Sequence, residues 1–450
     1  MLICLVACAA TVQAAKSITV DPTFAYYKDR TPDSIADELK ANGYDDVRLV
    51  GVNAELTKAI KASGSKVWFL TFMNGTYSAA ELPKGWESWK MKLRKGQGPD
   101  GFTYLCCNNP DYRAWKKKQI VAALKAAPYY GVDLVEPFFP AYSGPASDLY
   151  GCLCDSCAAA FKKMYPEVPG LPNFDDPKSP HFWKTDKTLY EKWVGFRVAS
   201  VVSYLDDIVN GKDGVREKCP DARVATWTLG VDVPSPIEKL REWEALDSAA
   251  IVKRVRPDLH VVQTDWPDWS KPDLSPKYPL KYKPIVDSIL EVAPKLPIML
   301  QVDIGSRADM RRTKSWLEDV EKCALQIGCV ATTSYEYSLG ESMYTENPLI
   351  IKAVSQADGL KLIFNKRLDT ASASNLGNYS LSSGRVDYAK VDGNVVYLTI
   401  SGSEDNPEVT VSGISDDESR RFYHDKPACV MTESARARAE SVEPTEATQP

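Results

Sequence analysis

Short apolar runs alternate with segments of helical periodicity from residue 16 to about residue 357. Runs of this length predict strands that are buried on both faces of a parallel sheet. Between them, apolar positions spaced three and four residues apart predict helices that pack outside the sheet. We expect strands at 17–20, 47–52, 66–72, 132–139, 223–229, 259–264, 298–302 and 329–334, and helices at 32–41, 54–62, 110–126, 187–208, 236–255, 284–292, 311–327 and 348–356.

Eight successive strand–helix units over 16–357 predict an α/β fold, namely a closed (β/α)8 TIM barrel with large loop insertions. A doubly wound open sheet is the alternative architecture. It rarely extends to eight such units, and no Gly-rich phosphate loop follows the first strand. The pattern therefore favours the barrel.

The periodicity changes near Leu360 to alternating positions with short, turn-bounded strands at 386–391, 395–400 and 409–411. Asp392-Gly393-Asn394 is typical of a hairpin turn between the first two of these strands. We predict a small C-terminal β-domain over 358–423. Residues 424–450 are rich in Glu, Ala, Thr, Ser and Pro, which predicts a disordered tail.

The first fifteen residues, MLICLVACAATVQAA, are apolar and end in small residues, as a secretory signal peptide does. Leu5-Val6-Ala7-Cys8 also resembles a lipoprotein box. Because the apolar run continues past Cys8, we favour plain secretion over a lipid anchor and expect a secreted or periplasmic protein. Later apolar runs fall short of the ~20 residues needed to span a membrane.

Composition narrows the chemistry. Hydrophobic residues make up 44% and charged residues 26%, as in an ordinary globular protein, and the formal net charge is −5. With no basic stripe, a nucleic-acid partner is not expected. Because the sequence holds only three histidines, carboxylates must carry most proton transfer.

The predicted C-terminal ends of the barrel strands, where the sites of such barrels lie, are rich in acids and aromatics. These positions hold Asp21, Tyr26, Asn74, Tyr77, Glu136, Trp227, Asp265, Trp266, Asp303, Tyr335 and Glu336. Aromatic faces stack on sugar rings, and two acids that flank a glycosidic bond can cleave it. Structural alternatives remain: Glu136 could pair with a buried Arg, and Asp265 or Asp303 could cap the loops that follow their strands.

Cysteines cluster before and within the loop after the fourth strand. Cys152, Cys154 and Cys157 lie within six residues, and Cys106 and Cys107 lie adjacent upstream. Four thiolates suit a closed tetrahedral zinc site that staples two loops together. Disulfides are the alternative in a secreted chain, but such crowded spacing strains their geometry, so we favour a structural zinc.

Two motifs resemble the family 42 glycoside hydrolases and related secreted barrel hydrolases. They are CCNNPDYR at 106–113 and GCLCDSC at 151–157, followed by Phe161. The resemblance implies one zinc held by Cys106, Cys152, Cys154 and Cys157, with Cys106 preferred over Cys107 by its distance from the proline. The family's acid/base follows strand four, at Glu136, and its nucleophile follows strand seven, at Asp303. Val135 stands where the family has Asn, and Asp303 where it has Glu.

We therefore expect a secreted, retaining glycoside hydrolase that acts on a carbohydrate substrate. Glu136 would be the acid, and Asp303 or Glu336 the nucleophile. Asp21, Tyr26, Asn74, Trp227, Asp265, Trp266 and Tyr335 would contact substrate. A catalytically silent, glycan-binding barrel at the cell surface is the alternative, and a zinc hydrolase is a weaker one because an all-thiolate site leaves no position for water. The sugar, the linkage and the oligomeric state are left open by the sequence.

Overall fold

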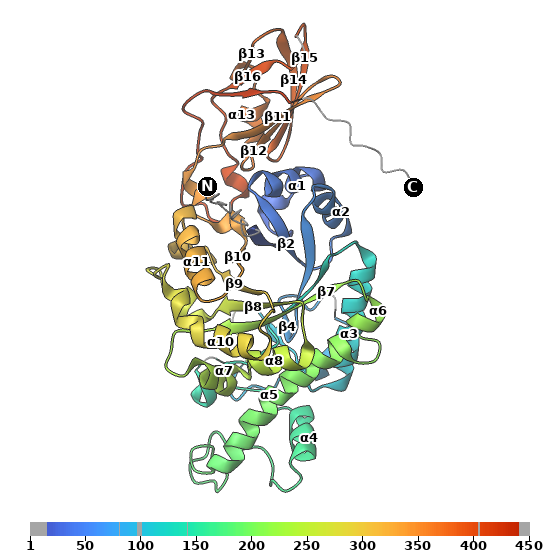
Figure 1. Cartoon of the computed structure of the whole chain (residues 1–450), viewed down its shortest axis with the longest axis vertical. Coiled ribbons are helices and arrows are strands. Elements are labelled where there is room, and N and C mark those ends of the chain that lie inside the picture. The colour runs from blue at the N-terminus through green and yellow to red at the C-terminus, as the bar shows by residue number, and fades with distance from the viewer. Residues whose placement is uncertain (1–15, 81, 97–100, 142, 404–405, 441–450) are drawn as a thin grey trace, which may run out of the picture.

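A closed ring of eight parallel strands forms the centre of the protein, which confirms the predicted barrel (Figure 1). The computed structural model describes residues 16–80, 82–96, 101–141, 143–403 and 406–440. The predicted signal at 1–15 lies outside these residues. In ring order the strands are β1 (Lys16–Val20), β2 (Tyr44–Val50), β3 (Lys66–Phe72), β6 (Gly131–Val135), β7 (Arg223–Gly230), β8 (Leu259–Thr264), β9 (Ile298–Val302) and β10 (Ala331–Tyr335).

Most of the helices surround the ring, and several begin at the capping residues that the sequence offers. The side chains of Thr31, Asn53 and Asn109 accept hydrogen bonds from the first-turn amides of α1, α2 and α3. None of the helices in the described part of the chain is long and apolar enough to cross a membrane. The helices are α1 (Pro32–Ala41), α2 (Ala54–Ala62), α3 (Pro110–Ala126), α4 (Asp155–Met164), α5 (Lys187–Asn210), α6 (Val215–Lys218), α7 (Pro236–Glu244), α8 (Ser248–Val255), α9 (Trp266–Trp269), α10 (Lys283–Val292), α11 (Lys314–Gln326), α12 (Ser342–Thr345) and α13 (Thr370–Ser374).

The single helix predicted over 236–255 is in fact two helices, α7 and α8. Ala245 adopts a left-handed conformation with φ of 62°, which ends α7, and the Asp247 side chain caps α8 by accepting from the amide of Ala250 at 2.9 Å. The fourth strand is also shorter than predicted, because β6 ends at Val135. Glu136 is therefore the first residue after the strand.

A buried ion pair crosses the interior of the ring. Arg48 on β2 bonds to Asp133 on β6, and its guanidinium also lies 3.2 Å from the sulfur of Met299 on β9. Both charged side chains are fully buried. Burial raises the pKa of Asp133, while the adjacent guanidinium lowers it. Each of the two charges in the barrel centre is thus compensated by the other, and removal of one would leave the other buried without its partner.

Replacing Asp133 with Ala is expected to destabilise the fold by about 3–5 kcal/mol, because the mutation leaves the Arg48 charge buried with only Asp46 nearby, at 3.7 Å. Urea unfolding measures this change. Asp45→Ala is the matched control, since Asp45 pairs with Lys40 in an exposed bridge and should cost less than about 1 kcal/mol. Equal costs for the two variants would contradict the account.

The C-terminal β-domain begins earlier and ends later than predicted. The helix predicted over 348–356 is wrong: Ile350–Gln356 is strand β11, which pairs with β12 (Gly359–Phe364). Two sheets follow, ordered β11-β12-β15-β14 and β13-β16-β17. They use β13 (Tyr379–Leu381), β14 (Arg385–Asp392), β15 (Val395–Ser401), β16 (Glu408–Val411) and β17 (Ala435–Arg438).

The disordered tail predicted at 424–450 is wrong for its described part. Strand β17 pairs with β16, and Met431 is buried in the core of the β-domain. Alternating alanines at 435 and 437 pack against that core, so small apolar side chains suffice for an edge strand here. Residues 441–450 lie outside the described residues.

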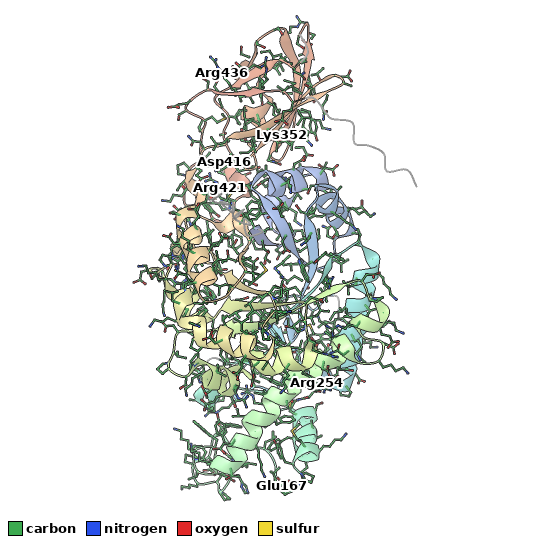
Figure 2. All side chains as sticks on the ribbon, viewed as in Figure 1. Glu167, Arg254, Lys352, Asp416, Arg421 and Arg436 are labelled. Atoms are coloured by element: carbon green, nitrogen blue, oxygen red, sulfur yellow. The ribbon has the colours of Figure 1, made fainter. Side chains whose placement is uncertain are left out.

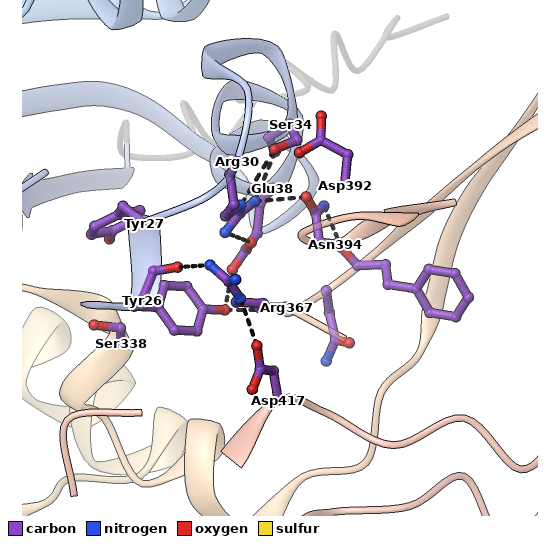
Figure 3. Close-up of polar contacts among 12 residues, drawn as sticks. Tyr26, Tyr27, Arg30, Ser34, Glu38, Ser338, Arg367, Asp392, Asn394 and Asp417 are labelled. Carbon is purple, nitrogen blue, oxygen red and sulfur yellow. Dashed lines mark hydrogen bonds and ion pairs between the residues drawn. The ribbon is translucent and has the colours of Figure 1, made fainter. Parts of the chain in front are cut away.

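Polar side chains join the barrel to the β-domain (Figure 3). Arg367 donates to the carbonyl oxygen of Tyr26 at 2.9 Å and to Asp417 at 2.9 Å, and the Tyr26 hydroxyl donates to Glu38. Arg421 and Lys366 both bond to Asp416 nearby, where Figure 2 marks the junction. The Arg367 guanidinium, itself held by Asp417, therefore fixes the β-domain to the barrel.

Candidate active site

A continuous cleft opens at the C-terminal ends of the barrel strands. It consists of two cavities of about 220 and 470 Å³ that share four lining residues: Tyr77, Glu136, Gln263 and Trp269. The smaller cavity lies over β3, β8, β9 and β10, and the larger one extends over β7 towards the end of α7. The cleft occupies the position at which barrels of this kind place their sites.

Glu136 lies where the two cavities meet. Its backbone has a left-handed φ of 54°, an uncommon conformation for a residue with a side chain, and such strain concentrates at functional sites. Apolar surroundings desolvate the half-buried carboxyl and raise its pKa to about 7. The alternative of a buried arginine partner does not hold among the described residues, because Arg48 bonds to Asp133 instead.

Asp303 follows β9 and lines the smaller cavity together with Glu136. Its carboxylate accepts hydrogen bonds from the amides of Gly305 and Ser306 at 2.8 and 2.9 Å, and from the Ser306 hydroxyl. Asp303 thus holds the loop that follows its strand, as the structural alternative predicts, and also faces the cleft.

Glu336 is not brought to the cleft. Its carboxyl is fully buried and accepts from the amide of Asp21 at 2.9 Å, the hydroxyl of Tyr27 at 2.6 Å and the hydroxyl of Ser338 at 3.0 Å. Burial raises its pKa to about 7 despite these bonds. With both oxygens engaged below the rim, Glu336 has the environment of a structural acid that orders the loop after β10.

The other predicted contact residues divide into two groups. Trp227, Asp265 and Trp266 line the larger cavity, and Tyr335 lines the smaller one.

The remaining three lie elsewhere. Asn74 is buried and donates to the carbonyl oxygen of Phe138 at 3.0 Å, Asp21 binds Thr23 in its own loop, and Tyr26 is buried between the barrel and the β-domain. These three residues hold the backbone and line neither of the two cavities.

Glu244 is a cleft residue that the sequence reasoning missed. It ends α7, lines the larger cavity and is 4% exposed. Burial raises the pKa of its carboxyl well above the usual range, and the charges of Asp265 and Glu136 raise it further. The sequence signal that could reveal it is the Ala-Leu-Asp-Ser stretch after it, where an Asp N-cap restarts the helix.

Arg197 on α5 holds this side of the cleft in place. Its guanidinium donates to the carbonyl oxygens of Glu242 and Trp243 at 2.7 and 3.0 Å, just before Glu244, and to that of Gly151 at 2.9 Å. It also stacks over the Tyr150 ring, 4.2 Å from the centroid. Arg197 therefore connects the loop after β6 to the end of α7.

A chain of aromatic rings forms one wall of the cleft. From Tyr77, which is exposed, ring centroids follow one another at 4.8, 5.0, 6.3 and 6.1 Å through Phe102, Tyr104, Phe138 and Trp227. Trp266 and Trp269 contact each other at 5.1 Å on the side of Asp265. Flat apolar surfaces beside carboxyl groups can stack on a sugar ring while the acids bind its polar substituents.

The predicted cysteine ligands converge beside the cleft. The sulfur atoms of Cys106, Cys152, Cys154 and Cys157 all lie within 4.8 Å of one another, whereas Cys107 is outside this group. The sulfur of Cys106 lies 3.4 Å from that of Cys157 and 3.5 Å from that of Cys154, which is too long for disulfide bonds. These distances are close to the ~3.8 Å that separates two ligands of a tetrahedral metal with metal–sulfur bonds of about 2.3 Å. The four thiols fit one metal ion.

Neighbouring groups complete the cysteine site. Asn108 donates to the sulfur of Cys157 at 3.4 Å and to the hydroxyl of Ser200 at 3.0 Å, so a side chain of α5 orients this ligand. Cys154 precedes the first turn of α4, and Cys157 lies within that turn. The positive end of the helix dipole therefore lies beside both of these cysteines.

Comparison with known proteins supports the fold at low identity. No family model and no curated protein matches this chain. The glycoside hydrolase domain of PgaB (BpsB) from Bordetella bronchiseptica is similar with a TM-score of 0.54 and 11% identity, over 72% of this chain and 94% of that domain. A catalytic mutant of Gan42B, a GH42 β-galactosidase from G. stearothermophilus, is similar with a TM-score of 0.50 and 16% identity, over 72% of this chain and 50% of that enzyme. The chain thus has the fold of glycoside hydrolase TIM barrels.

Proposed function

We propose that the protein is a glycoside hydrolase that cleaves a glycosidic bond at the mouth of the barrel. The observation that carries the proposal is the pair of acids in the smaller cavity, with Glu136 largely desolvated and Asp303 held by amide donors. An acid that can hold its proton near neutral pH, with a second carboxyl group beside it in the same cavity, is what this chemistry requires. Membership of family 42 and secretion belong to the same proposal.

The proposed reaction is a double displacement with retention. Glu136 donates its proton to the leaving oxygen as the glycosidic C–O bond breaks, and an Asp303 oxygen bonds to the anomeric carbon. The ionised Glu136 then takes a proton from water, whose oxygen displaces Asp303 and regenerates both groups. The aromatic wall from Tyr77 to Trp227 would hold the sugar ring during both steps.

A panel of aryl glycosides that covers common sugars in both anomeric forms tests this function. The wild-type protein is expected to release the phenol from at least one of them. Proton NMR of the first-formed sugar should show the same anomer as the substrate, because two displacements restore the configuration. An inverted product would exclude the nucleophile role of Asp303, and no release from any glycoside would contradict the enzyme itself.

A silent, glycan-binding barrel is the second candidate function. Asp303 favours it in one respect, since the side chain is one methylene shorter than the family's Glu and three hydrogen bonds hold it in its own loop. On this account the cleft binds glycans without turnover. Glycan binding with no hydrolysis across the panel would support this second function over the first.

The cysteine cluster is proposed to hold a structural zinc. Cys106, Cys152, Cys154 and Cys157 would bind it as thiolates, and an all-thiolate set leaves no open position for catalysis. When bound, zinc would supply a rigid cross-link between the loops before α3 and before α4. Arg197 bonds to the carbonyl oxygen next to Cys152, so the cross-link would support the wall of the cleft without touching substrate.

A further inference from the structure

A loop of the β-domain lies on the barrel at its mouth. This rim loop, residues 417–428, belongs to the connection between β16 and β17. Its two ends are joined, because the amide of Asp416 donates to the carbonyl oxygen of Cys429 at 3.0 Å and the Asp416 side chain accepts from the amide of Cys429 at 2.9 Å. The chain therefore leaves the β-domain and returns to it at one point.

The rim loop contacts three of the loops that follow barrel strands. Phe422 packs against Phe24, in the loop after β1, with ring centroids 5.3 Å apart. The ring of Tyr423 lies 6.1 Å from that of Tyr344, which belongs to α12 after β10. The hydroxyl of Tyr423 donates to the carbonyl oxygen of Gly305, in the loop after β9, at 2.9 Å. The β-domain thus reaches the loop that carries Asp303.

Gly305 connects the rim loop to the carboxylate of Asp303. Its carbonyl oxygen accepts from Tyr423, while its amide donates to the Asp303 carboxylate at 2.8 Å. The turn after β10 lies close to the same residue, since a Cβ on Gly305 would clash with the carbonyl oxygen of Leu339. Because one residue carries both hydrogen bonds, a shift of Gly305 also moves the amide that holds the carboxylate.

The Tyr423 hydroxyl is a well-placed donor for this contact. Burial is the main reason that its pKa rises to about 12, so the hydroxyl keeps its proton at neutral pH. The Arg311 guanidinium lies over the rings of both Tyr344 and Tyr423, 4.3 and 5.3 Å from their centroids, and the Arg311 side chain is only 5% exposed. These contacts hold the Tyr423 ring, so its hydroxyl meets Gly305 with little freedom.

We propose that Tyr423 is a positioning residue of the active site, which holds the carbonyl oxygen of Gly305 and thereby fixes the Asp303 carboxylate in the cleft. The inference rests on the proposed glycosidase function and gives the β-domain a part in it. Tyr423 lines neither of the two cavities, so its effect passes through one hydrogen bond and the backbone. A nucleophile displaced by about 1 Å can lose on the order of 10²-fold in rate.

Hydrogen exchange of the full chain, followed by mass spectrometry, tests the hold on the loop. In Tyr423→Phe, a peptide that covers 303–310 should exchange about 3- to 10-fold faster than in the wild type, because one hydrogen bond to the loop is lost while the ring stays. Tyr379→Phe is the matched control. The Tyr379 hydroxyl also donates to a backbone carbonyl oxygen, that of Ala373 at 2.6 Å, but inside the β-domain. This variant should leave exchange of 303–310 unchanged.

Kinetics with a glycoside that the wild type cleaves test the catalytic part. Tyr423→Phe should lower kcat/KM by about 10-fold without raising KM, because the loss falls on the transition state. The loss should be equal for good and poor leaving groups, since Asp303 attacks the anomeric carbon in both, whereas an effect through Glu136 would spare the good one. Tyr379→Phe should keep the wild-type kcat/KM, and thermal melts show that both variants are folded.

The outcomes separate the two proposals. Unchanged exchange of 303–310 in Tyr423→Phe would overturn the inference, and so would faster exchange with unchanged kcat/KM. The same losses in Tyr379→Phe would also overturn it, because a general loss of stability would then explain them. If the wild type cleaves no glycoside, the glycosidase function fails and the catalytic role of Tyr423 fails with it, while the exchange result still decides whether Tyr423 fixes the loop.

Discussion

Glu136→Gln is expected to lower the turnover of a glycoside with a poor leaving group by a factor of about 10²–10⁴, because the departing oxygen then receives no proton. A nitrophenyl glycoside of the same sugar needs little protonation to leave, so its glycosylation step should slow far less. Steady-state kinetics with the two substrates measures the contrast. A variant that remains fully active on both would show that Glu136 is not the acid.

The pH dependence of kcat/KM is expected to follow the ionisation of Glu136. Burial raises the pKa of Glu136 to about 7, so the carboxyl is protonated below this pH and loses its proton above it. An acid catalyst must be protonated, and kcat/KM of the wild type should therefore fall as pH rises through about 7. Asp265 has a pKa of about 7 as well, so the Glu136→Gln variant is needed to assign this fall.

Asp303→Asn distinguishes a nucleophile from a binding residue. If the Asp303 oxygen forms the bond to the anomeric carbon, the amide abolishes the turnover of both leaving groups, whereas the loss of a mere binding contact would mainly raise KM. The hydrogen bonds from Gly305 and Ser306 keep the loop near its native position in the variant. Unchanged kcat would assign the chemistry to another acid of the cleft.

The barrel could be predicted from the sequence because its strands are continuous apolar runs whose ends carry polar residues. Glu136 and Asp303 were found in this way, since each directly follows a strand, and the strand order brings both to one mouth. Asp265 and Trp266 follow β8 in the same way, whereas Tyr335 ends β10 and Trp227 lies within β7, and all four line the cleft. For these residues, position along the chain determines position in space.

Where the prediction missed, contacts between distant segments decide the structure. Glu244 was hidden because helical periodicity continues through Ala245, and the break there depends on a left-handed residue and the Asp247 cap. Tyr26 follows β1 but turns outward, because the β-domain offers Arg367 as a partner 341 positions away. Ile350–Gln356 becomes a strand because β12 pairs with it, and local propensity alone does not reveal that partner.

The cysteine cluster is recognisable from spacing, and its loss should have the largest effect on structure. Purified, reduced protein is expected to contain about one zinc per chain, and Cys152→Ser should lose most of it, because a three-thiolate site binds zinc less tightly. Elemental analysis measures the metal. Cys107→Ser is the matched control, since this buried neighbour lies outside the cluster and should keep the full zinc content.

Loss of zinc should also change the shape of the cleft, because hydrogen bonds to the backbone connect the cysteine cluster to the cleft wall. Gly151 precedes Cys152 and bonds to Arg197, which in turn holds the carbonyl oxygens just before Glu244. In Cys152→Ser we therefore expect faster proteolysis of the loop between β6 and α4, a lower melting temperature and weaker substrate binding, all without removal of a group that touches substrate. If mass spectrometry instead finds disulfides among the four cysteines and no metal, the zinc prediction is wrong and the loops are joined by covalent bonds. Chelators would then leave both the stability of the protein and its substrate binding unchanged.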